Sequence, residues 1–314
     1  MMMKNIHLLI AFLIFLFLSC ANSSSNKNLD EENQRLKVEL ELFKNLENNR
    51  QRVVEHSGTR MFNVENEREV VSVLFDTEDF DIYGRAVWTP NFAERLDFPI
   101  SYDGFCYTKT DKVLFFNDEF QRALVIFGTY EIMDNEEVNT SHVSSPMLSL
   151  AYFTQRKNNE WELTAFKKSF VHHGSWGEMG NTEIKQVGKK NFVLDLSWGY
   201  NSTGEGKEWT TFYSIPDFNE IFHITTAHTF SGFEENDKNA FANKAKFSIL
   251  PSDKRFGDIL IEITGTKPSD KEERIISANE DKVFVYDEQA GVYIVQIEPE
   301  ETPVTDETSI EITP

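Results

Sequence analysis

ALVIFGTYEI, residues 123–132, is a run rich in Val, Ile, Phe, Thr and Tyr, the residues that favour β-strands. Similar short runs recur from about Arg60 to Gln296, and no long helical pattern interrupts them. The region therefore reads as a chain of strands. The clearest other strand candidates are 70–75, 111–116, 148–155, 161–171, 192–198 and 209–215.

Turn-forming residues separate these runs. The stretches 157–159 and 188–191 predict hairpin connections, whereas 201–206, NSTGEG, predicts a longer loop. The spacing predicts a mainly β fold in which the body is an antiparallel sandwich, a barrel or a propeller-like array. A short amphipathic helix is expected to precede this body.

The composition changes at 231–244, which marks a sub-boundary within a globular body that spans 60–297. Further strands are expected in 247–267 and 282–297, with a hairpin around Glu288 to Gly291. These strands form either a small second β unit or the last strands of the first. The second reading is preferred, because so few strands are marginal alone.

The formal net charge is −21, from 31 Lys and Arg against 52 Asp and Glu. Such a surface repels phosphate backbones, so a nucleic-acid partner is not expected. No phosphate-cradling glycine-rich loop and no dinucleotide fingerprint occurs, and no cofactor is expected.

The N-terminal residues follow the order of a secretion signal, in which a basic residue precedes an apolar run and a small residue. Residues 1–19 contain one lysine, then an apolar run from Ile6 to Leu18 that is too short to span a bilayer. The sequence that ends this run, Phe17-Leu18-Ser19-Cys20, resembles a bacterial lipoprotein signal. That resemblance implies cleavage before Cys20, lipid attached to its sulfur, and an anchored protein of the bacterial cell envelope, in the outer membrane rather than the inner. The alternative is an ordinary secretory signal with an incidental cysteine.

The regions beyond the signal and the body are polar. Residues 20–28 form a lipidated tether, and 298–314, with six acids and three prolines, predict a disordered acidic tail. Residues 29–56, which follow the tether, have apolar residues at the seven-residue spacing of a coiled coil, at Leu29, Leu36 and Phe43. This helix is either a coiled-coil stem that forms a homo-oligomer or a helix that lies against its own domain.

Two stretches share the sequence Ser-Trp-Gly, at 175–177 and 197–199. A glycine after tryptophan allows a turn that leaves an indole exposed, as in platforms that stack on sugar rings. Trp176, Trp198 and the nearby Trp209 are therefore the candidate ligand platform. The alternative is that these indoles are core residues that end strands.

Other reactive residues give weak patterns. Neither the adjacent His172 and His173 nor the pair His223 and His228 has the spacing of a zinc site, and the acidic stretches 76–81 and 234–239 lack the spacing of a calcium loop. No metal site is expected. Cys106 stands between aromatic residues and is expected to be a buried thiol.

No catalytic set of residues stands out, which favours a non-enzymatic binding or scaffold module over an enzyme. A glycan or an envelope protein is the expected partner. The alternative function is a secreted hydrolase of carbohydrate or cell-wall polymers, with catalytic acids drawn from Asp195, Glu205 and Glu208.

Overall fold

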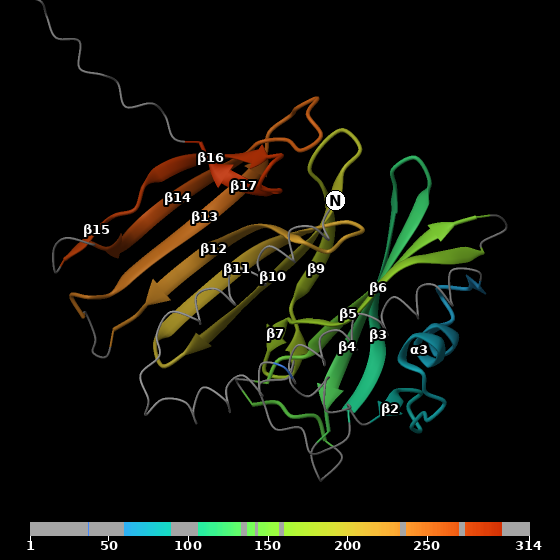
Figure 1. Ribbon diagram of the computed structural model, residues 1–314. Helices are drawn as coiled ribbons and strands as arrows, with labels where there is room; N and C mark the ends of the chain where they lie inside the picture. Colours follow the sequence, from blue (N-terminus) through green and yellow to red (C-terminus); the bar gives the residue numbers. More distant parts are fainter. Residues whose placement is uncertain are drawn as a thin grey trace, which may run out of the picture.

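The computed structural model describes residues 37, 60–88, 106–132, 137–141, 144–156, 160–232, 237–269 and 274–296 (Figure 1). Within these ranges the chain is mainly β, and every strand pair is antiparallel, which confirms the predicted fold class. The signal, the tether and the acidic tail lie outside the described residues, and so does the expected stem, apart from Lys37.

The first sheet has six strands in the order β1-β6-β5-β4-β3-β2 (Figure 1). Four successive strands, β3 to β6, form a meander, and they correspond to the predicted strands at 111–116, 123–132, 148–155 and 161–171. The strand bounds are β1 (Met61–Phe62), β2 (Ala86–Trp88), β3 (Cys106–Asn117), β4 (Gln121–Glu131), β5 (Met147–Gln155) and β6 (Trp161–His172).

The second sheet has nine strands in the order β17-β16-β14-β13-β12-β11-β10-β9, with β15 paired to β14. The strands after 231–244 continue this sheet, because residues 227–230 pair with 241–244. The predicted hairpin around 288–291 is confirmed by the pairing of the last two strands. The bounds are β9 (Asn181–Gln186), β10 (Phe192–Ser202), β11 (Glu205–Ser214), β12 (Glu220–Phe230), β13 (Phe241–Ile249), β14 (Ile259–Pro268), β15 (Ile275–Ser277), β16 (Glu280–Asp287) and β17 (Val292–Val295).

The strand predicted at 70–75 is wrong, because this segment belongs to a helix, α3 (Glu67–Phe75). Asn66 caps the helix by accepting a hydrogen bond from the Glu69 N–H at 3.3 Å, and Glu67 and Glu69 place negative charge in the first turn. Residues 70, 71, 74 and 75 are buried together, at the spacing of one helix face. The cap and this spacing outweigh the β preference of the valines.

The loop predicted at 201–206 is also wrong. Strand β10 runs to Ser202 and β11 starts at Glu205, so only Thr203 and Gly204 lie between them. Their φ angles are 50° and 82°. Two successive positive φ values characterise the tight type I′ hairpin, in which glycine is favoured. The two strands are therefore paired without a break from Val193 and Ser214 to the turn.

The two sheets share a core. Apolar residues of β4 and β5 pack against residues of β10 and β11, and the cluster comprises Leu124, Ile126, Leu148, Leu150, Tyr152, Leu194, Leu196, Tyr213 and Phe218. Two lysines add polar contacts between the sheets: Lys112 Nζ donates to the Thr182 carbonyl at 2.8 Å, and Lys167 Nζ donates to the Phe218 carbonyl at 3.3 Å. The position of β10 and β11 is thus fixed relative to β4 and β5.

Two further cores flank the shared one. On its other face the six-stranded sheet packs against α3 through Val70, Leu74 and Phe75, as Figure 1 shows at the right. A third cluster lies within the nine-stranded sheet, where Phe212, Phe222 and Ile261 are fully or almost fully buried. Each sheet is therefore stabilised by apolar packing beyond the part that the two share.

Candidate functional site

A two-residue hairpin presents Trp176 at the surface. Strands β7 (Gly174–Ser175) and β8 (Glu178–Met179) flank a turn of Trp176 and Gly177, whose φ angles are 57° and 70°. Such turns favour Asn-Gly, and a bulky aromatic residue with positive φ is an outlier. The Trp176 side chain is 50% exposed, so burial of the indole does not explain this choice of residue.

Neighbouring segments hold this hairpin in place. The Gly177 N–H donates to the Ser144 carbonyl at 2.9 Å, and a Cβ on Gly177 would lie 2.7 Å from the Asn139 carbonyl oxygen. On the other side, Ser175 Oγ donates to the Gly199 carbonyl of β10 at 3.2 Å. These contacts oppose relaxation of the turn and place Trp176 beside β10.

A row of aromatic residues faces the same region from β10 and β11. Trp198 lies directly opposite Trp209 in the strand register, with ring centroids 5.0 Å apart, and the Tyr200 ring lies 5.6 Å from Trp209. Since side chains alternate along a strand, Trp198 and Tyr200 continue the face that carries Leu194 and Leu196. The face that forms the shared core at one end thus forms an aromatic surface further along.

Trp176, Trp198, Tyr200 and Trp209 together line a groove of about 480 Å³, which we call the tryptophan groove. Its polar lining residues are Ser175, Ser197, Asn201, Glu208 and Thr226. The structure therefore brings together all three tryptophans predicted from the sequence. The turn expected after each tryptophan is present at Trp176, but the second Ser-Trp-Gly stretch lies within β10. Tyr200, Asn201 and Thr226 had not been predicted.

His173 supports the groove from behind. It is 1% exposed, and its Nε2 donates to the Asn181 carbonyl at 3.0 Å. A Cβ on Gly180 would lie 2.6 Å from His173 Nε2 and 2.7 Å from Trp198 Cβ, so these groups pack closely. Burial lowers the pKa of His173 from 6.5 to about 4, because a charged imidazole would lose its hydration there. The neutral side chain therefore belongs to the packing beneath Trp198.

Asp195 is a buried carboxylate that forms an ion pair with the partly exposed Lys185. Its carboxylate is 1% exposed, and Oδ2 lies 2.5 Å from Lys185 Nζ. Its other oxygen accepts a hydrogen bond from Ser197 Oγ at 2.8 Å. The Lys185 ammonium in turn lies 4.6 Å from the centre of the Phe247 ring. The Asp195 carboxylate therefore has a structural role, because removing its partner would leave a buried charge uncompensated and would destabilise the fold.

Glu205 and Glu208 lie in the first four residues of β11. Glu205 Oε1 accepts from Lys207 Nζ at 2.8 Å and from His228 Nε2 at 3.0 Å. These hydrogen bonds, that of Lys207 above all, lower the pKa of Glu205. Glu208 pairs with Gly199 in the register and lines the tryptophan groove.

The three carboxylates do not converge. Asp195 pairs with Phe212 of β11, and Phe212 is four residues from Glu208 on that strand. At 3.3 Å per residue, Asp195 and Glu208 are therefore separated by roughly 13 Å along the strand direction. Glu205 and Glu208 are three apart on one strand and point to opposite faces. Paired glycosidase carboxyls stand about 5–9.5 Å apart on either side of one bond. Of the three, Glu208 lines the groove, from the strand face opposite that of Trp198 and Trp209.

The histidines have separate partners. His172 Nδ1 donates to the Ser145 carbonyl, and His223 Nδ1 lies 2.8 Å from Thr211 Oγ1. Among the described residues, no group of three His, Cys, Asp or Glu side chains is placed to hold a metal ion. In the acidic stretch 76–81, Asp81 binds Arg85, with Oδ2 2.5 Å from Nε. Cys106 is a buried thiol.

The helices in the described part of the chain include none with the length and apolar character needed to cross a membrane.

Comparison of the chain with protein-family models, with curated proteins and with solved structures finds no match. Any assignment of function must therefore come from the residues and their geometry.

Proposed function

We propose that this protein is a lipid-anchored binding protein of the bacterial envelope, whose β body holds a neutral saccharide in the tryptophan groove. The observation that carries the proposal is the convergence of Trp176, Trp198, Tyr200 and Trp209 on one groove from two separate segments. Flat aromatic faces are suited to the C–H faces of sugar rings.

The polar lining supports a saccharide over an apolar ligand. Ser175, Asn201 and Thr226 offer groups that donate and accept hydrogen bonds, as hydroxyl-rich ligands require. The charged residue that lines the groove is Glu208, and the net charge of the whole chain is −21. An anionic polymer would be repelled, whereas a neutral sugar would not.

The strained turn at Trp176 also supports binding. A φ of 57° disfavours tryptophan, and the hairpin would form more readily with asparagine at this position. Outliers of this kind concentrate at functional sites, where the side chain serves a purpose other than stability. Contact with a ligand is such a purpose for a half-exposed indole.

Isothermal titration of the full chain with a panel of neutral oligosaccharides tests the proposal. Trp198→Ala should weaken binding about tenfold or more, because it removes the centre of the aromatic surface. Trp88→Phe is the matched control, since Trp88 lies outside the groove and binds Thr108 Oγ1 at 2.8 Å. Equal affinities in all three proteins would refute the proposal. Chromatography of the titrated sugar should show it intact, and release of shorter products would favour the hydrolase instead.

The lipid anchor is the second part of the proposal. Acyl chains on Cys20 would contribute about 0.8 kcal/mol for each buried CH₂, and more than one chain makes membrane attachment stable. Metabolic labelling with a fatty-acid analogue should tag the protein, and Cys20→Ala should remove the tag. A tag that persists in Cys20→Ala would contradict attachment at this sulfur.

Self-association through residues 29–56 would make the tryptophan groove multivalent. Native mass measurement of the protein with and without residues 21–56 tests this part. An oligomer that becomes a monomer on deletion is the expected result. A monomer in both samples would exclude the coiled-coil stem.

A further inference from the structure

A second groove, of about 670 Å³, lies at one end of the six-stranded sheet, where strands β1, β3, β4, β5 and β6 begin or end. We call it the arginine groove. Its aromatic lining residues include Phe115, Phe116 and Trp161, and its amide residues include Asn117, Gln121 and Gln155. The Phe115 side chain is 55% exposed, and its ring lies 5.6 Å from that of Trp161. Aromatic surface and amides are therefore combined, as in the first groove.

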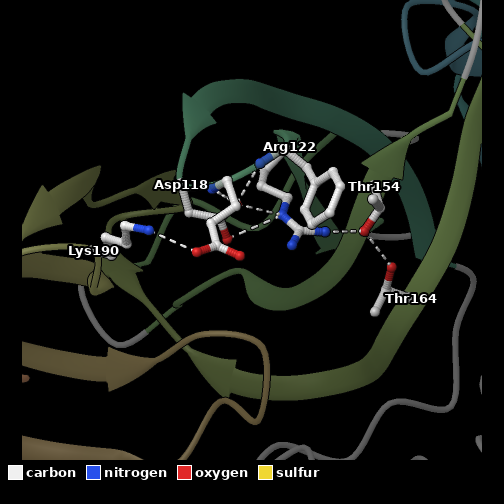
Figure 2. A network of polar contacts seen from close by, with 7 residues as sticks. Asp118, Arg122, Thr154, Thr164 and Lys190 are labelled. Carbon is white, nitrogen blue, oxygen red and sulfur yellow. Dashed lines mark hydrogen bonds and ion pairs between the residues drawn. The ribbon is translucent and has the colours of Figure 1, made fainter.

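Arg122, at the start of β4, is held rigidly in this groove (Figure 2). Its Nε donates to both oxygens of Asp118, at 3.2 and 3.1 Å, and its Nη1 donates to Thr154 Oγ1. Thr154 is fixed in turn by a 2.9 Å hydrogen bond between its hydroxyl and that of Thr164. The guanidinium is therefore positioned before any ligand arrives.

The turn that carries Asp118 is braced from the other sheet. Lys190, in the connection between β9 and β10, donates to Glu119 Oε1 at 2.6 Å (Figure 2). Asp118 Oδ1 accepts from the Phe120 N–H at 2.8 Å. Partial burial alone would raise the pKa of Asp118, but these hydrogen bonds and those of Arg122 outweigh it and hold the pKa below its usual value. Asp118 thus stays ionised and keeps Arg122 in place.

One nitrogen of Arg122 remains available. Nη2 donates no hydrogen bond to any residue in the described part of the chain, and Figure 2 shows it without a dashed line. A guanidinium nitrogen carries only donors, so a ligand must supply an acceptor such as a hydroxyl or an acetal oxygen. Because Asp118 balances the charge of Arg122, this acceptor does not have to be an anion.

The rim of the groove is acidic. Glu65 and Glu160 line it, and neither makes an ion pair within the described ranges. Glu69 also lines it and is paired with Arg60 at 3.3 Å. An anionic ligand would meet these carboxylates at close range, whereas a protonated amine would be attracted to them.

We propose that the arginine groove is a second saccharide site, selective for sugars that carry a free amine. Phe115 supplies the stacking surface on one face of the sheet, and Arg122, on the other face beside Phe116, supplies Nη2 to a ring or hydroxyl oxygen at the end of the strands. Glu65 and Glu160 attract the ammonium group. The site is separate from the tryptophan groove in residues and in preferred charge.

Titration with a trisaccharide of glucosamine and with its N-acetylated counterpart tests this proposal. The full chain carrying Trp198→Ala is used, so that the tryptophan groove does not contribute. The amine-bearing sugar should shift the indole N–H signal of Trp161 and should bind about two- to fivefold more tightly than the acetylated one. Glu65→Gln should reduce this preference without weakening the acetylated sugar.

Two exposed apolar residues provide matched variants. Phe115 is 55% exposed and lines the groove, whereas Ile294 is 46% exposed and lies in β17 of the other sheet, so neither substitution removes a buried side chain. Phe115→Ala should weaken the glucosamine trisaccharide about two- to tenfold, and Ile294→Ala should leave its affinity unchanged. Equal effects of the two variants, an unmoved Trp161 signal, or no binding by the full chain would each overturn the proposal. None of these results would bear on the proposal for the tryptophan groove, which the panel of neutral oligosaccharides tests independently.

Discussion

Trp198 of β10 lies directly opposite Trp209 of β11, and their ring centroids are 5.0 Å apart. This cross-strand pair lies on the sheet face that is buried against β4 and β5 only a few residues away, at Leu194 and Leu196. Beside the pair, the hairpin of Trp176 adds a third indole. The fold thus continues an apolar core face as the aromatic lining of a groove along the same two strands.

Replacing Trp176 by asparagine separates binding from stability. Asparagine tolerates the φ of 57° that tryptophan resists, so Trp176→Asn should leave the free energy of unfolding unchanged or raise it by up to about 1 kcal/mol. Saccharide binding should fall sharply, because the exposed indole is lost. Chemical denaturation and calorimetric titration of the same sample give both values. A destabilised variant that still binds would show that Trp176 serves the fold.

His173 predicts a dependence of stability on pH. Its pKa falls from 6.5 to about 4 on folding, so the unfolded chain binds more protons between these values. The stabilising contribution of the neutral side chain is complete above pH 6.5 and is lost as the pH falls towards 4, to a total of about 3 kcal/mol. Denaturation of the wild type and of His173→Gln across this range measures the difference. Parallel curves for the two proteins would contradict the assignment.

The ion pair between Lys185 and the buried Asp195 predicts that one substitution has a strong effect on stability and that two together have a weak one. Lys185→Met leaves the Asp195 carboxylate buried without its partner and should cost about 3–5 kcal/mol. Adding Asp195→Leu removes the charge and should restore most of that loss. Denaturant unfolding of the single and double variants checks this. If Lys185→Met is harmless, the pair is not a structural group.

Helix α3 depends on its cap. Asn66→Ala removes the acceptor of the Glu69 N–H and should lower the free energy of unfolding by about 1 kcal/mol. Asn66→Ser keeps an acceptor and should cost much less, which makes it the control. Urea titrations of the three proteins distinguish them. Equal stability of all three would argue against a capped helix at 67–75.

The strands were predictable because aromatic and β-branched residues concentrate in them, as in 123–132 and 148–155. The same rule failed at 70–75, where Val70, Val71 and Val73 favour a strand. The signals for a helix were present in Asn66, Glu69 and the spacing of the apolar residues, but the prediction rested on the β preference of the valines alone.

The candidate site was predictable only in part. The repeated Ser-Trp-Gly identified Trp176 and Trp198, but the loop expected at 201–206 hid the alternation that places Tyr200 beside Trp198. The pairing of Asp195 with Lys185 depends on the register between β9 and β10, which the sequence does not reveal. Asp195, three residues before Trp198 in the sequence, was therefore included with Glu205 and Glu208 among the candidate catalytic acids.

The five tryptophans of the chain allow the central claim to be tested in one measurement. Each indole N–H gives its own signal in a ¹H–¹⁵N spectrum, recorded while a neutral oligosaccharide is added to the full chain. The signals of Trp176, Trp198 and Trp209 should move together and saturate at one concentration, while that of Trp88 stays in place. If those three signals remain still while the sugar binds, or if Trp88 moves with them, the ligand does not occupy the tryptophan groove.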